Sequence, residues 1–133
     1  MTPEEARERF ASARVARLAT ADADGVPHIV PLVFAIDGDT IYSAVDPKPK
    51  RTTDLKRLRN VTANPRVALL ADHYVDDDWD VLWWARADGT GTVHESLPRA
   101  AELLRDRYVQ YAFVPPEGPV LEIAVQHWSG WAA

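Results

Sequence analysis

The chain of 133 residues contains no cysteine, so a disulfide framework and a thiolate metal site are both excluded. Its first ten residues are charged and lack the apolar stretch of a signal peptide. No apolar run approaches the length of about 20 residues that a membrane-spanning helix needs. These absences predict a cytoplasmic protein with no membrane partner.

Lysine is scarce, and its few copies are gathered in one place. The only lysines are Lys48, Lys50 and Lys56, and Arg51, Arg57 and Arg59 lie among them, with Asp54 as the one acidic residue of 48–59. The rest of the chain is acidic, because the formal net charge is −5, and this argues against a nucleic-acid partner. Cations, threonine hydroxyls and a helix start in one segment are typical of a phosphate site. A solvated helix face is the alternative interpretation.

The remaining pattern predicts one mainly β domain over residues 1–133, with short helices. Strands are expected at 15–20, 26–36, 40–45, 66–73, 81–93 and 120–125, where apolar residues alternate or run together between turn signals. Helices are expected at 3–12, from a cap at Thr52 or Thr53 to Asn64, and at 97–109. Six consecutive strands joined by tight turns favour a closed antiparallel sheet, that is, a small barrel.

The sequence also predicts where several individual residues lie within this barrel. Pro31 indicates a sheet edge or a bulge, and Gly89 indicates a bulge or a barrel corner. Trp83 and Trp84 are neighbours on one expected strand, so they should point to opposite faces. Trp128 and Trp131 predict that the C-terminal segment docks, either on its own barrel or on a partner subunit.

Known catalytic signatures are missing from the sequence. There is no Gly-x-Gly-x-x-Gly, no Walker motif and no nucleophile elbow. The four histidines lack helical metal spacing, and the acidic stretch 76–80 lacks the glycine and the final glutamate of a calcium loop, so no metal site is predicted. No general acid or base stands out. A bound redox cofactor that carries the reaction itself fits this absence.

The chain resembles the split-barrel family of flavin- and deazaflavin-binding oxidoreductases, the pyridoxamine-phosphate-oxidase-like group. The resemblance covers residues 4–133 and rests on VARLAT (15–20), GVPHIVP (25–31), DTIYS (39–43), KRTTDLKRLRN (50–60) and NPRV (64–67). Two further segments, LWWARADG (82–89) and WSGW (128–131), are similar to a subgroup described as dependent on coenzyme F420, a deazaflavin.

The resemblance implies a six-stranded antiparallel split β-barrel that forms a homodimer with two cofactor sites at the interface. It places the cofactor phosphate at Lys48, Lys50, Arg51, Thr52 and Thr53, with Lys56 one helical turn further on. It places the ring system along Val30, Pro31 and Leu32 and beside Ser43 and Ala44. Arg57 and Arg59 would serve the oligoglutamate tail of F420, and the loops 74–80 and 110–118 would shape the substrate pocket.

One departure bears on the choice of cofactor. The second expected strand lacks the Arg-x-x-x-x-Lys that pyridoxamine phosphate oxidases direct toward the FMN phosphate, since residues 31–36 are apolar. We therefore expect an F420-dependent oxidoreductase that transfers hydride to or from a small-molecule substrate. The alternatives are an FMN-binding reductase or oxidase on the same fold, and a non-catalytic cofactor carrier or sensor.

Overall fold

A computed structural model describes residues 1–45 and 55–133 of the chain. Its strands form one sheet in the order β2-β1-β5-β6-β7-β4-β3, and every neighbouring pair is antiparallel. The strands are β1 (Ala16–Ala21), β2 (Pro27–Leu32), β3 (Ala35–Asp37), β4 (Thr40–Ala44), β5 (Arg66–His73), β6 (Trp83–His94) and β7 (Val120–Ala132). The helices are α1 (Pro3–Ser12), α2 (Lys56–Ala63), α3 (Pro98–Arg107) and α4 (Val109–Phe113), with a 3₁₀ turn at Trp79–Val81. The mainly β, antiparallel prediction is confirmed.

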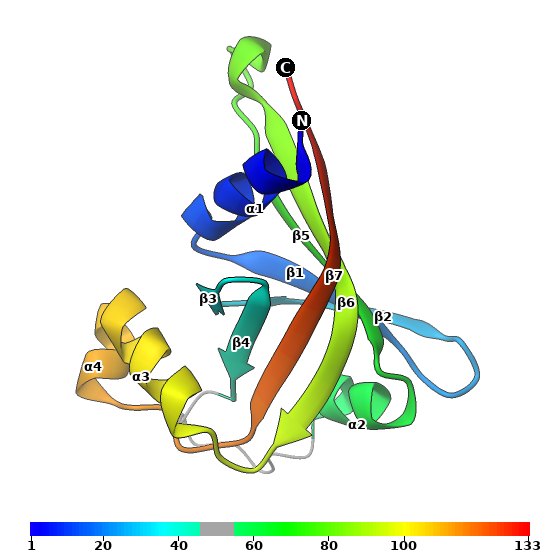
Figure 1. Ribbon diagram of the computed structural model, residues 1–133, viewed down its shortest axis with the longest axis vertical. Helices are drawn as coiled ribbons and strands as arrows, with labels where there is room; N and C mark the ends of the chain where they lie inside the picture. The colour runs from blue at the N-terminus through cyan, green and yellow to red at the C-terminus, as the bar shows by residue number, and fades with distance from the viewer. Residues whose placement is uncertain (46–54) are drawn as a thin grey trace.

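The two outermost strands of the sheet, β2 and β3, are consecutive in the chain. Only Val33 and Phe34 separate them, and we call this join the seam. The described residues thus form seven strands where six were expected, because the segment 26–36 is divided. The reason is packing: Phe34 and Ala35 are both buried, which breaks the alternation of a single strand and turns the chain from one edge of the curled sheet to the other (Figure 1).

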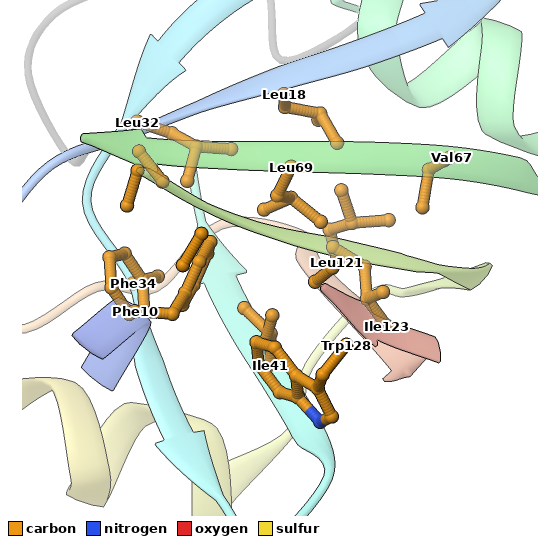
Figure 2. Packing of buried hydrophobic residues seen from close by; sticks show 14 of the residues in the cluster. Phe10, Leu18, Leu32, Phe34, Ile41, Val67, Leu69, Leu121, Ile123 and Trp128 are labelled. Carbon is orange, nitrogen blue, oxygen red and sulfur yellow. The ribbon is translucent and has the colours of Figure 1, made fainter. Parts of the chain in front are cut away.

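Helix α1 begins as its sequence predicts and covers one side of the barrel. Thr2 accepts a hydrogen bond from the backbone N–H of Glu5, and the Glu5 carboxylate accepts one from the backbone of Thr2, which completes the capping box. The helix inserts Phe10, which is fully buried. The Phe10 ring lies 4.8 Å from that of Phe34 and 5.4 Å from that of Trp128, so α1 joins the seam to β7 through the core (Figure 2).

The C-terminal segment docks on its own barrel. Strand β7 stays paired with β6 as far as Ala132, and Trp128 is buried, with its indole N–H donating to Asp39 at 3.0 Å.

The prediction that Trp83 and Trp84 point to opposite faces is confirmed, since Trp83 is buried in the core whereas Trp84 lies on the outer face opposite Trp131. Pro31 lies on an edge strand, and the β6–β7 register shifts between Asp88 and Gly89, as expected.

The helices differ from expectation in two places. Helix α2 begins at Lys56 with Leu55 as its N-cap and no side-chain cap, so the predicted cap at Thr52 or Thr53 is wrong; both threonines lie outside the described residues. The expected helix 97–109 ends at Arg107, and the short α4 follows it. Helix α2 ends before Asn64-Pro65 as expected, and no helix within 1–45 or 55–133 has the length and apolarity to span a membrane.

Candidate functional site

A pocket of about 280 Å³ opens at the seam of the barrel. We call it the seam pocket, and its lining residues come from the ends of β2 and β4, from the segment before β1, and from α2 and α4. They are Val15, Pro31, Leu32, Val33, Ser43, Ala44, Arg57 and Tyr111. Four of the predicted ring-binding residues therefore meet in one place: Pro31, Leu32, Ser43 and Ala44.

Val30 and Lys56, the other predicted residues that the structure describes, do not line this pocket. Val30 lies in the middle of β2 and packs against the core. Lys56 is exposed at the first turn of α2, near the β1–β2 turn. The pKa of Asp22 in that turn is lowered chiefly by the hydrogen bond from the backbone N–H of Val26, and the charge of Lys56 adds a smaller lowering. Lys48, Lys50, Arg51, Thr52 and Thr53 lie outside the described residues.

The walls of the seam pocket are apolar apart from a few polar atoms. Leu32 and Ala44 are buried, and Pro31 brings a ring without a backbone N–H to the outer edge of β2. The buried Ser43 hydroxyl donates to the backbone oxygen of Val33 at 2.9 Å, which fixes the serine across the seam. Flat apolar walls with a few polar groups at fixed positions are typical of sites for small ring-shaped ligands.

Arg57 brings a cation to the rim of the pocket. It is half-buried on α2, and it makes further interactions of its own within the chain. The helix that carries it is anchored by Asn60, which is buried and donates from its amide to the hydroxyl of Thr20 on β1 at 3.0 Å. Because that bond links α2 to the barrel wall, the position of Arg57 relative to the pocket is set by buried polar contacts.

Tyr111 forms the opposite wall, and a network around Tyr108 holds it there. The Tyr108 ring lies edge-on to Tyr111 at 6.1 Å. Arg107 donates to the backbone oxygens of Ala11 and Ala13 and lies 4.9 Å from the Phe34 ring centroid. These contacts fix the junction of α3 and α4 against the seam. Tyr111 falls in the segment 110–118 that was expected to shape the pocket, but the sequence does not single it out.

The seam pocket has few ionisable groups among its described lining residues. Within the described ranges, no group of three or more histidine or acidic residues is arranged to hold a metal ion. The described lining of the pocket includes no carboxylate and no histidine, so its ionisable members are Arg57 and Tyr111. The arrangement is suited to holding and orienting a ligand, with a cation at its rim.

Comparison with known proteins places the chain in a family. Residues 2–132 match the family described as pyridoxamine 5′-phosphate oxidase. No curated protein matches the chain. Among solved structures, a conserved hypothetical protein from Mycobacterium tuberculosis is 20% identical with a TM-score of 0.76, over 99% of this chain and 85% of that one.

Two further structures share the fold at low identity. An FAD-binding protein from Mesorhizobium loti is 24% identical with a TM-score of 0.73, over 98% of this chain and 92% of that one. HutZ, the heme storage protein of Vibrio cholerae, is 15% identical with a TM-score of 0.71, over 99% and 95%. Likeness at this level concerns the fold, whereas the family match spans almost the whole chain. The protein therefore belongs to the pyridoxamine 5′-phosphate oxidase family of split β-barrels.

Proposed function

We propose that the protein binds the ring of a phosphorylated flavin-type cofactor in the seam pocket and acts as an oxidoreductase. Coenzyme F420 is the cofactor that we favour, and FMN is the alternative. The observation that carries the proposal is the meeting of Pro31, Leu32, Ser43 and Ala44 around one pocket. The family resemblance assigns all four of these residues to the ring of the cofactor. An apolar slot with one cation at its rim fits a flat ring that carries an anionic chain.

The anionic end of the cofactor is assigned to Arg57 and to the basic segment that precedes it in sequence. Arg57 lines the pocket, and the residues from Lys48 to Thr53 lead into α2.

The size of the pocket supports a homodimer. A volume of about 280 Å³ lies just below the range of small-molecule sites, roughly 300–1,000 Å³. We therefore propose that a second copy of the chain completes each cofactor site. Phe113 and Val109 on α4 are strongly exposed beside the wall formed by Tyr111, which leaves apolar surface for that second copy.

A bound flavin or deazaflavin would supply the hydride chemistry. The chain would orient the ring between Leu32 and Ala44 and keep water from it. The lining residues described above offer no carboxylate and no imidazole, which leaves the phenol of Tyr111 as their candidate proton donor. The same composition favours a second candidate function, a carrier or sensor that holds the cofactor without turning it over.

Titration of the purified protein tests the proposed cofactor, after its visible absorbance has been recorded for any ligand retained on purification. F420, FMN and haemin are compared, since the related folds include FAD- and heme-binding proteins. We expect micromolar binding of F420. Retained FMN without F420 binding would select the alternative, and haemin binding alone would overturn the flavin assignment.

Substitutions locate the site. Arg57→Gln should weaken F420 and FMN about tenfold, whereas Arg105→Gln, an exposed arginine on α3, should change neither. Arg59→Gln should weaken F420 alone, because only F420 carries an oligoglutamate tail. The double variant Lys50→Glu/Arg51→Glu should weaken both cofactors and leave the fold intact. Unchanged binding in Arg57→Gln and in the double variant would mean that the anionic end lies elsewhere.

Stopped-flow oxidation of the reduced, bound cofactor separates the enzyme from the carrier. A rate that rises with the concentration of an added acceptor indicates an oxidoreductase. A rate that no tested acceptor changes indicates a carrier or a sensor.

A further inference from the structure

A second and larger cleft, of about 550 Å³, lies between α1, the start of β1, the end of β5 and the start of β6. We call it the arginine cleft. The residues that give it its character are Arg9, Arg14, Arg17, Asp72, His73 and Trp83. Val15 lines both this cleft and the seam pocket, so the two sites adjoin. None of the described residues assigned to the cofactor from the sequence lines it.

The cleft carries an excess of positive charge. Arg9, Arg14 and Arg17 line it, and Asp72 is the one carboxylate among the described lining residues. Asp72 pairs with Arg17 at 3.3 Å, with both side chains half exposed. Glu5 and Glu8 on α1 line an adjoining hollow, which shares Arg9 and Ser12 with the cleft. In a chain with a formal net charge of −5, a local surplus of two guanidinium groups is a marked departure.

Arg9 and Arg14 are held in place without a carboxylate partner in the part of the chain that the structure describes. The Arg9 guanidinium lies 5.9 Å from the centroid of the Trp83 ring. The Arg14 guanidinium lies 4.7 Å from that of Tyr108 and donates to the backbone oxygen of Arg107 at 2.7 Å. Among residues 1–45 and 55–133, neither arginine has an acidic group within 4.0 Å. Stacking on a ring orients a guanidinium and leaves its N–H groups available for an oxyanion.

The floor of the cleft is aromatic. The His73 ring lies 6.3 Å from the Trp83 ring at an interplanar angle of 21°, and Val15 and Val81 add exposed apolar surface. An arginine-rich rim above an aromatic and apolar floor suits an organic molecule with an oxyanion at one end.

We propose that the arginine cleft is a second binding site, for the carboxylate or phosphate group of an organic anion. The oxyanion contacts Arg9 and Arg14 and competes with Asp72 for Arg17. The anion belongs either to a separate substrate or to the far end of the molecule whose ring occupies the seam pocket, which it would reach past Val15. The existence of the cleft site does not depend on the proposed cofactor.

The test is an NMR titration of the cofactor-free protein with glutarate, with backbone and Trp83 indole N–H signals followed. We expect saturable shifts confined to residues 9–17 and 72–83. Arg9→Gln should weaken binding about fivefold or more, and Asp72→Asn should strengthen it about threefold, because it removes the competing carboxylate and frees Arg17.

Arg86→Gln is the matched control. Arg86 lies 5.8 Å from the centroid of the Trp84 ring and pairs with Asp88 at 3.1 Å. It therefore has a tryptophan contact like that of Arg9 and a carboxylate partner like that of Arg17, but it lies on the outer face of the sheet, outside the cleft. Its removal should leave glutarate binding unchanged. Shifts that do not saturate, shifts spread over the whole surface, or equal weakening in Arg9→Gln and Arg86→Gln would overturn the proposal.

A second titration, at saturating F420 or FMN, identifies the source of the anion. Loss of glutarate binding in the presence of F420 but not of FMN assigns the cleft to the tail of the cofactor. Glutarate binding that persists with both assigns it to a separate anionic substrate. Either result supports the cleft site and is independent of which cofactor the seam pocket takes.

Discussion

The hydroxyl of Tyr108 lies 3.2 Å from the backbone nitrogen of Phe34 and 2.9 Å from its backbone oxygen. The same hydroxyl lies 2.8 Å from the backbone oxygen of Arg14. One side chain from the α3–α4 junction therefore satisfies the backbone of the seam, where neither β2 nor β3 supplies a ladder partner. At the seam, the Tyr108 hydroxyl therefore takes the place of a neighbouring strand as the hydrogen-bond partner of the Phe34 backbone.

Replacement of Tyr108 by phenylalanine should destabilise the protein. The change leaves the N–H of Phe34 without its partner in a partly buried position, at a cost of about 1–2 kcal/mol. The free energy of unfolding from urea titration is the measurement. Tyr74→Phe is the control, because the Tyr74 hydroxyl bonds to Asp76 at the exposed surface and its loss should cost less than about 0.5 kcal/mol. Equal costs would show that the seam does not depend on Tyr108.

Gly89→Ala should be more destabilising than an ordinary glycine substitution. A Cβ at this position would lie 2.3 Å from the backbone oxygen of Ala124, which belongs to the paired strand β7. The ladder at the bulge would have to shift, and we expect a cost of about 3 kcal/mol. Gly25→Ala is the comparison: its Cβ would meet open space, and the positive φ of 80° alone costs about 1–2 kcal/mol. Thermal melting of both variants measures the difference.

The two C-terminal tryptophans should differ sharply in their effect on stability. Trp128→Ala removes a buried indole that packs on Phe10 and donates to Asp39, so the free energy of unfolding should fall by about 3–5 kcal/mol. Trp131→Ala removes a half-exposed ring from the outer face and should cost about 1 kcal/mol or less in the isolated chain. If Trp131→Ala lowers the dimer fraction in sedimentation, the outer face contributes to the proposed homodimer.

Tyr42 should give the protein a loss of stability in alkali. Its pKa is raised above the usual value near 10, first by burial and then by Glu122, which lies opposite it on β7. Above about pH 10 the unfolded chain releases this proton while the folded chain retains it, so the free energy of unfolding falls as the pH rises. In Tyr42→Phe that fall should be smaller. Equal slopes in the two proteins between about pH 10 and 12 would contradict this origin.

Local signals predicted much of the fold. The capping box at Thr2 and Glu5, the stop at Asn64-Pro65 and the edge position of Pro31 follow from chemistry within a few residues, and the structure has all three. The division of the strand at Val33 and Phe34 was missed, because it depends on how the sheet curls and not on the local pattern. Helix α4 was missed for a related reason: its exposed Val109 and Phe113 give no amphipathic signal.

The candidate site was predictable in part. The strand residues from Pro31 to Ala44 follow from the resemblance, and the structure brings four of them together. Arg57 was assigned to the tail of the cofactor, whereas it lines the seam pocket itself. Tyr111 and the arginine cleft depend on contacts between residues as distant in sequence as Arg14 and Arg107, which a single sequence does not reveal.

The order of strands in the sheet has a mechanical consequence. Its two edge strands, β2 and β3, are joined through Val33 and Phe34 and are not paired with each other in the sheet. A ligand between Pro31 on β2 and Ala44 on β4 would contact both sides of this seam. We therefore expect ligand binding to slow amide hydrogen–deuterium exchange first at residues 33–35.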